Sequence, residues 1–128
     1  MTLSQRDRLL LAFADLAGYG IAAHESLAAP PDEAHAALRA ELAARHPQGL
    51  GSYVFWTAID DARFDIDGEL TAPLPLHVSA EEVAAAALAA GRSHGLSIVP
   101  AMPSGPVLFV QPLAQGARVR ADAVLAAH

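Results

Sequence analysis

The spacing of apolar residues predicts two helices in the first third of the chain. Leu9, Phe13 and Leu16 recur at the i, i+4 and i+7 positions of one helix face. Gly18 follows them and is predicted to end that helix in a left-handed conformation. Residues 30–33, two prolines followed by two acidic residues, suit the first turn of a second helix.

A third helix is predicted to begin at residues 79–82. Their sequence, Ser-Ala-Glu-Glu, has the pattern of a capping box, in which the first and fourth side chains satisfy free N–H groups at the start of a helix. Apolar residues continue with helical spacing to about residue 93, and Gly95 is placed to close the helix.

Extended segments separate these helices. Residues 52–59 give the clearest strand, because aromatic and β-branched side chains suit a pleated surface. Residues 70–78 contain two prolines of the same parity, and since proline cannot donate a ladder hydrogen bond, this strand is predicted to be bulged or to lie at an edge. The remaining strands are predicted at 19–24, 96–99 and 107–110, the last two forming a hairpin around a turn at 103–106.

Taken in order, the elements are a helix, then β-α-β-β-α-β, then one extra strand. This order predicts a single α+β domain over residues 1–128, a ferredoxin-like sandwich with an N-terminal helix and an extra C-terminal hairpin strand. We expect the two crossover helices to cover one face of the sheet, and the N-terminal helix to cover the other face or an edge. The segment from Arg118 onward fits either a helix or a further strand.

The chain also resembles an uncharacterised bacterial family, a domain of unknown function. The resemblance rests on the order and spacing of Tyr53-Val54-Phe55-Trp56, Asp60, Gly68-Glu69-Leu70, the helix with Val83 and Leu88, and Gly95-Leu96. It supports the predicted fold. It implies no activity, cofactor or catalytic residue, because none is established for the family.

Composition narrows the classes of function. Of 128 residues 53% are hydrophobic and 17% charged, which is typical of one folded domain rather than a disordered chain. Eight basic and fourteen acidic residues give a net charge of −6, which argues against nucleic acid as a partner because phosphate binding needs Lys and Arg. The chain has no cysteine, so thiolate metal sites and cysteine nucleophiles are excluded.

The apolar runs are too short to enter a membrane. The run at residues 9–14 stops at Asp15, which is shorter than the core of an export signal. No later stretch reaches the ~20 apolar residues that a membrane-spanning helix needs. The sequence therefore predicts no membrane association and a cytoplasmic location.

Acidic and histidine residues are the first candidates for a site. Asp60, Asp61, Asp65 and Asp67 lie in one connection between strands and could hold a hard cation, although their spacing does not match a calcium loop. The alternative is a solvated loop whose charges protect a sheet edge. His24, His77 and His94 lie at the ends of predicted elements, but no pair of histidines has the spacing of a zinc motif.

The aromatic strand supplies a further candidate. Alternation places Tyr53 and Phe55 on one face and Val54 and Trp56 on the other, which favours core packing over base stacking. Trp56 is singled out because its indole N–H needs a partner when buried. The chain shows no nucleophile elbow and no dinucleotide fingerprint, and we expect no cofactor.

Two hypotheses of function follow. The first is a non-catalytic binding or regulatory module that forms a homodimer, since the hairpin strand 107–110 offers an apolar edge; the acidic surface also permits a basic protein partner. The second is a small metal-dependent or acid–base enzyme that uses Asp60 or Asp61 with His24 or His77. The candidate binding residues are His24, Trp56, Asp60, Asp61, Arg63 and His77, and none is assigned as catalytic or as a metal ligand.

Overall fold

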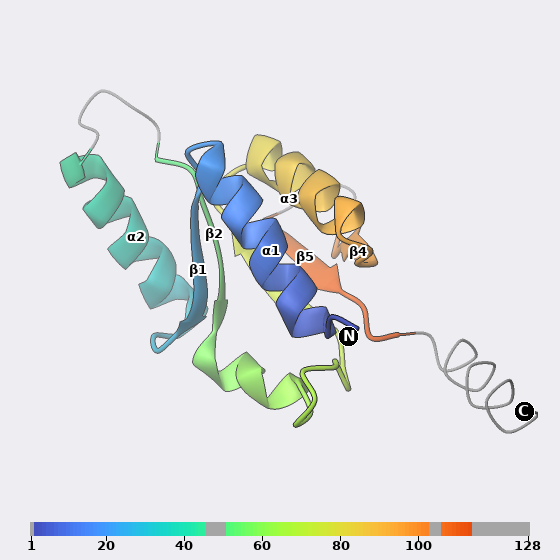
Figure 1. The fold of residues 1–128 in the computed structure, drawn as a ribbon. Coiled ribbons are helices and arrows are strands. Elements are labelled where there is room, and N and C mark those ends of the chain that lie inside the picture. The colour runs from blue at the N-terminus through green and yellow to red at the C-terminus, as the bar shows by residue number, and fades with distance from the viewer. Residues whose placement is uncertain (1, 46–50, 103–105, 114–128) are drawn as a thin grey trace, which may run out of the picture.

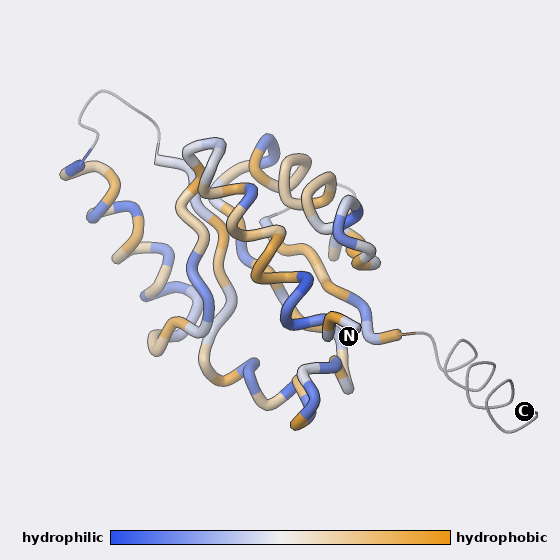
Figure 2. Tube along the Cα trace, in the orientation of Figure 1, coloured by the Kyte–Doolittle hydropathy of each residue, from blue (hydrophilic) through white to orange (hydrophobic). Residues whose placement is uncertain are grey.

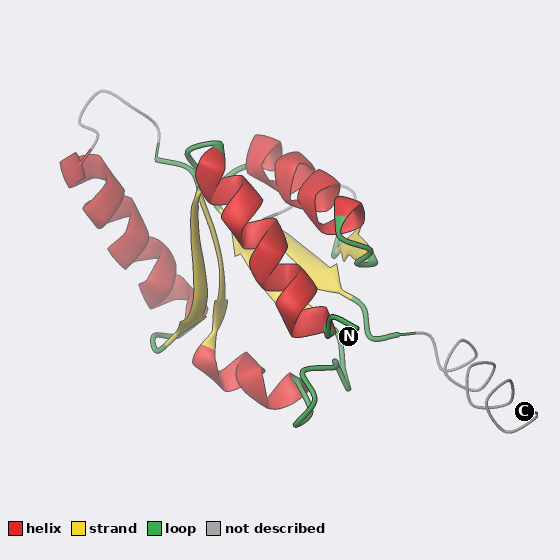
Figure 3. Ribbon diagram, viewed as in Figure 1, coloured by secondary structure: helices red, strands yellow, loops and turns green. Residues whose placement is uncertain are grey.

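The computed structural model describes residues 2–45, 51–102 and 106–113, and in them three α-helices pack on a five-stranded mixed sheet (Figures 1 and 3). The elements in chain order are α1 (Gln5–Gly18), β1 (Ala22–Leu27), α2 (Pro31–Arg45), β2 (Tyr53–Thr57), the 3₁₀ helix η1 (Ala58–Arg63), β3 (Leu74–Val78), α3 (Glu81–Ser93), β4 (Ile98–Pro100) and β5 (Val107–Val110). The predicted α+β class is confirmed. The turn at 103–105 and the segment 114–128 lie outside the described residues.

The strand order is β1-β2-β3-β5-β4. β1 and β2 are parallel, and every other neighbouring pair is antiparallel. The ferredoxin-like order is not confirmed, because β1 and β2 are direct neighbours, whereas a split β-α-β unit has another strand between its two parallel strands. Of the two strand–helix–strand crossovers, only β3-α3-β4 has a strand, β5, between its two parallel strands.

The prediction that both crossover helices cover one face is wrong. α1 and α3 cover one face of the sheet, and α2 packs on the other. The handedness of the connections explains this. The steps from β1 to β2 and from β3 to β4 move in the same direction across the sheet, but β3 runs antiparallel to β1. Since both connections must be right-handed, their helices lie on opposite faces.

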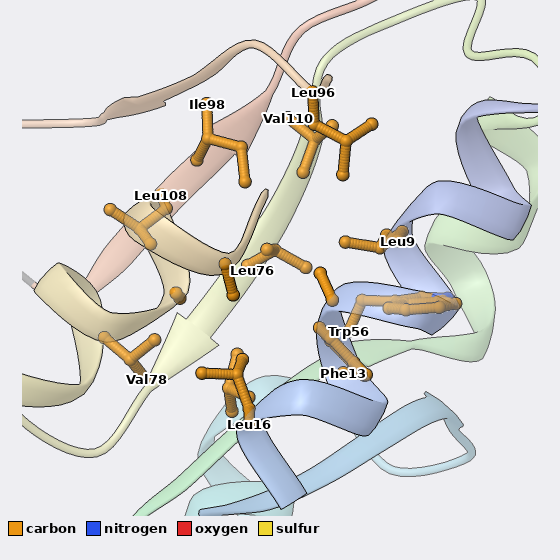
Figure 4. Close-up of a cluster of buried hydrophobic side chains, with 14 of the residues drawn as sticks. Leu9, Phe13, Leu16, Trp56, Leu76, Val78, Leu96, Ile98, Leu108 and Val110 are labelled. Atoms are coloured by element: carbon orange, nitrogen blue, oxygen red, sulfur yellow. The ribbon is translucent and has the colours of Figure 1, made fainter. Parts of the chain in front are cut away.

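The larger core lies between the sheet and the pair α1 and α3 (Figure 4). Leu9, Phe13 and Leu16, the residues that predicted the first helix, are all buried there. They contact a layer of sheet residues whose side chains point to the same face, namely Val54, Trp56, Leu74, Leu76, Val78, Ile98, Leu108 and Val110. The apolar residues of α1, which recur every three to four positions, therefore pack on strand residues that recur every second position.

The smaller core lies under α2. Ala34, Leu38 and Leu42 form its buried stripe and pack on Tyr53 and Phe55. Hydrophobic and hydrophilic stretches alternate along α2, as expected for a helix with one buried face (Figure 2). This cluster draws its buried residues from α2 and β2 only, so within the described residues it covers only part of the sheet.

Two strands for which the sequence indicated an edge position lie inside the sheet: β3, predicted to be bulged or at an edge, and β5, predicted to offer an apolar edge. β3 lies between β2 and β5, and β5 lies between β3 and β4, which leaves β1 and β4 as the edge strands. Of the two prolines only Pro75 lies within β3, which tolerates it because the pairing with β2 has already ended. Ser79 donates its N–H to Tyr53 O of β2, and Pro75 points to the same side because it has the same parity. The β2–β3 pairing ends at Phe55 and His77, so Pro75 lies beyond the ladder and interrupts none of its hydrogen bonds.

Two predicted helix ends differ in detail. α1 ends at Gly18, but the left-handed residue is Gly20, with φ of 84°. α3 has no capping box: Ala80 is the N-cap and makes no side-chain hydrogen bond. The Ser79 hydroxyl instead accepts the Tyr53 N–H at 3.0 Å. This serine therefore joins β3 to β2 rather than capping the helix.

A buried amide joins distant parts of the chain. The Gln5 side chain, 5% exposed, donates to Gln111 O at 2.9 Å and accepts the Leu70 N–H at 2.8 Å. Its own backbone N–H donates to the Glu69 carboxylate at 3.2 Å. The first turn of α1 is thereby fixed to the segments that precede β3 and follow β5.

Two glycines in helices give a matched test of packing. A Cβ on Gly91 of α3 would overlap Ile98 Cδ1, whereas a Cβ on Gly18 of α1 would meet nothing within 4 Å. We expect Gly91→Ala to lower the free energy of unfolding by about 1–3 kcal/mol, because the core must shift. Gly18→Ala is expected to leave it unchanged or raise it by about 0.5 kcal/mol. Urea unfolding followed by Trp56 fluorescence measures both, and equal values for the two variants would contradict the packing.

Candidate functional site

The six predicted site residues fall into two groups. The first group is Trp56, near the end of β2, with Asp60, Asp61 and Arg63 of η1. His24 and His77 lie on the α2 face of the sheet, on either side of Phe55.

Asp61 is the acceptor that the buried indole requires. Trp56 donates its Nε1–H to Asp61 Oδ1 at 2.7 Å, as the sequence led us to expect for a buried tryptophan. The Ser26 hydroxyl donates to the other carboxylate oxygen, Oδ2. Asp61 therefore links η1 to both β1 and β2.

Arg6, which the sequence did not indicate, completes this cluster. Its guanidinium lies 5.7 Å from the ring centroid of Trp56 and 5.4 Å from that of Phe64. It pairs with Glu25 at 3.2 Å and with Asp61 at 3.6 Å. The cluster of Arg6, Glu25, Ser26, Trp56 and Asp61, which we call the Arg6 cluster, joins α1, β1, β2 and η1.

Ser26 adopts a conformation that is uncommon for a residue other than glycine. Its φ is 56°, and the register of β1 with β2 shifts between His24 and Leu27. A left-handed serine costs about 1 kcal/mol or more. Its hydroxyl reaches Asp61 from this bulge. Each member of the Arg6 cluster contacts Arg6 or Asp61, so its geometry is that of a structural junction.

Asp60 belongs to a different set of contacts. It is buried, and its carboxylate accepts the Thr57 hydroxyl at 3.1 Å and the Arg63 Nε–H at 2.9 Å. Arg63 also donates to Pro73 O at 2.8 Å. These bonds hold η1 against the segment that leads into β3.

The remaining acidic residues of this connection form a turn. Asp65 Oδ1 accepts the N–H groups of Asp67 and Glu69, each at 2.9 Å, and Gly68 has φ of 85°. Within the described residues, no three His, Asp or Glu side chains are grouped closely enough to hold a metal ion.

Three histidines lie on the α2 face. His24 and His77 are each paired with Phe55 in the sheet register, so all three side chains share that face. His35 of α2, which the sequence did not single out, contacts His77 with ring centroids 5.9 Å apart and an interplanar angle of 87°. The His35 Nδ1 also bonds to the Tyr53 hydroxyl.

Phe55 lies at the centre of this imidazole cluster. Its ring stacks on His77 at 5.0 Å and 23°, and meets His35 edge-on at 5.0 Å. Burial lowers the pKa of His77, and His35 lowers it further while Asp60 opposes the shift. Burial also lowers the pKa of His35, with Arg39 adding to the shift and Asp32 opposing it. Both shifts favour the neutral imidazole.

His94 lies elsewhere, at the end of α3. Its Nε2 is 2.6 Å from Asp15 Oδ2, and its carbonyl accepts from Arg8 at 2.8 Å. Both partners are on α1. His94 therefore links α3 to α1 and does not lie with His24 and His77.

These contacts bear on the enzyme hypothesis. Both oxygens of Asp60 and both oxygens of Asp61 already accept hydrogen bonds from neighbouring side chains. His24 and His77 are separated by the width of β2. This geometry supports an acid–base pair less well than it supports a structural role for the carboxylates.

Comparison with known proteins finds nothing similar to the chain: no family model, no curated protein and no solved structure matches it. The resemblance to a bacterial family therefore stays a prediction. Among the described helices, none combines the length and the apolar character needed to cross a membrane. A cytoplasmic location stays a prediction of the sequence.

Removing one charge tests the Arg6 cluster. We expect Asp61→Asn to lower the free energy of unfolding by about 1–3 kcal/mol, because Arg6 loses a partner and the Ser26 hydroxyl loses a charged acceptor. Asp67→Asn changes an exposed carboxylate in the same connection and should stay within about 0.5 kcal/mol of the wild type. Urea unfolding with Trp56 emission measures both, and equal effects would contradict the role of Asp61.

The imidazole cluster predicts a pH dependence of stability. Because the pKa of His35 and that of His77 are lower in the folded chain than in the unfolded chain, the unfolded chain binds protons first as pH falls. Stability is then full above about pH 6.5 and decreases as pH falls from there toward the folded pKa values. The double variant His35→Gln/His77→Gln should lose less stability than the wild type between pH 7.5 and 5.5 in urea unfolding. His24→Gln serves as a control, and an unchanged slope in the double variant would refute the assignment.

Proposed function

We propose that the chain is a non-catalytic protein-binding module that associates with a second copy of itself. The surface that we assign to this contact is the part of the sheet that α2 does not cover. It consists of Pro75, Val99, Val107 and Phe109, with His77 at its margin, and we call it the open face.

The register places these residues together. Phe109 of β5 is paired with Pro75 of β3 on one side and with Val99 of β4 on the other. Val107, two residues before Phe109 in β5, is paired with His77 of β3. Paired residues of a sheet point to the same face, so three strands contribute side chains to one apolar surface centred on Phe109.

The open face is outside both cores. The residues that alternate with it, such as Leu76 and Leu108, are fully buried against α1 and α3. Val99, Val107 and Phe109 belong to neither buried cluster, and Val99 is 40% exposed. A strand with apolar residues on both faces is typical of a sheet that is covered on both sides. This is the single observation on which the proposal depends.

The lack of charged residues in the open face argues against a basic partner at this surface. None of the four residues of the open face carries a formal charge, while the chain as a whole has a net charge of −6. A basic protein would gain little from contact with this surface. A second copy presents the same apolar patch, so a two-fold axis near Phe109 would bring two equivalent patches together.

The edges of the sheet are less suited to association. β4 has only three residues and ends in Pro100, and β1 carries the bulge at Ser26 and the exposed charge of Glu25. Short strands, prolines, bulges and charges all oppose pairing of an edge with another chain. The sequence led us to expect that the apolar strand 107–110 would offer an edge. It is an inner strand, and in the proposed contact it contributes its face instead.

Charge substitutions on the open face test the proposal. We expect the wild type to be a dimer at ~50 µM, in the range of ordinary homodimer affinities, and Phe109→Glu to be monomeric there, because the contact would bury two carboxylates. Val99→Glu at the same surface should act in the same direction. Ile66→Glu, at a residue 99% exposed in the turn before β3, is the matched control and should leave the dimer intact.

Sedimentation velocity gives the mass of each variant, and near-UV circular dichroism shows whether each is folded. A monomeric wild type at this concentration would refute self-association. A dimer that survives both Phe109→Glu and Val99→Glu would refute the open face as its contact.

A further inference from the structure

We propose that His77 makes this self-association dependent on pH, so that two copies bind each other while its imidazole is neutral and separate as it takes up a proton. The inference rests on the proposed function, because it assigns a means of regulation to the open face.

The position of His77 joins the open face to the imidazole cluster. On one side it is paired with Val107, a residue of the open face, and on the other with Phe55, which lies under α2. One ring face is already covered by Phe55, at 5.0 Å, and His35 approaches edge-on at 5.9 Å. A second copy seated on Val107 and Phe109 would cover the part of His77 that still reaches water.

The groups around His77 do not stabilise its positive form as well as that water does. From α2 it faces His35, which is itself next to Asp32 and Arg39. From β2 it faces Phe55, while the Tyr53 hydroxyl is bonded to His35. From η1 only the Asp60 carboxylate favours a positive imidazole, and that carboxylate is bonded to Thr57 and Arg63. From β5 it faces Val107, and His24 lies two strands away.

The sign of the effect follows from burial. Removing solvent from His77 destabilises the charged imidazole more than the neutral one. The pKa of His77 is therefore lower in the dimer than in the monomer. Protons then bind the monomer preferentially, and lowering the pH from 7.5 to 5.5 raises the Kd. Each pKa unit that association removes from one imidazole raises the limiting Kd about tenfold, and a two-fold dimer contains two copies of His77.

The overall charge of the chain has the opposite effect. Lowering the pH protonates acidic and imidazole groups, which reduces the net charge of −6 and hence the repulsion between two copies. A general charge effect would therefore strengthen association in acid. Weaker association at pH 5.5 is a specific signature of a buried neutral group.

The test is sedimentation velocity at pH 7.5 and 5.5 on the full chain and on two variants. His77→Gln keeps a polar side chain that does not titrate, and His94→Gln changes a histidine on the opposite face, between α1 and α3. We expect the Kd of the wild type and of His94→Gln to rise about tenfold or more at pH 5.5. The Kd of His77→Gln is expected to stay within about threefold.

The outcomes separate the two proposals. A wild-type dimer whose Kd does not rise at pH 5.5 overturns the role of His77 and leaves self-association standing. The same pH dependence in His77→Gln as in the wild type also overturns it. A monomeric wild type at pH 7.5 overturns the proposed function, and this inference with it.

A measurement on the wild type covers the case in which His77→Gln fails to fold. Nuclear magnetic resonance titration of the imidazole signals gives the pKa of His77 at low and high protein concentration. We expect the pKa of His77 to fall as concentration rises. A pKa that is the same when the chain is monomeric and when it is associated would overturn the inference.

Discussion

The burial of β2 on both faces is the constraint on which the rest of the structure depends. All five of its residues are buried. Tyr53 and Phe55 hold α2 on one side, while Val54 and Trp56 hold α1 and α3 on the other. Because the strand is shared by two cores, neither helical layer packs independently of the other. The chain leaves β2 directly into η1, so both carboxylates of η1 are placed by the same strand.

The elements could be predicted from the sequence, but their arrangement could not. Periodicity located all three helices, and the aromatic segment located β2, because both signals are local. The strand order depends on the direction in which each crossover steps across the sheet, and no residue pattern records that direction. Two crossovers that step the same way from antiparallel strands place α2 and α3 on opposite faces. The opposite step would have given the predicted single helical layer.

The candidate site, too, could be predicted from the sequence only in part. The partner of Trp56 was found only five residues along the chain, and Asp60 and Arg63 are three residues apart, so these contacts lay within reach of sequence reasoning. Arg6 and His35 were missed, because each meets its partners only after α1 and α2 have packed on the sheet. His77 had been considered for metal or acid–base chemistry. Its place between the imidazole cluster and the open face gives it a different proposed role.

The amide of Gln5 has a consequence for how the chain is made. Its NH₂ group donates to the backbone carbonyl of Gln111, a residue 106 positions later. The first helix can form early during synthesis on the ribosome, but its N-terminal turn cannot reach its final position until that late segment has left the exit tunnel. The segment that follows β5 therefore completes the environment of the first turn of α1. An interrupted translation product that lacks this segment would leave the buried Gln5 amide without its Gln111 partner.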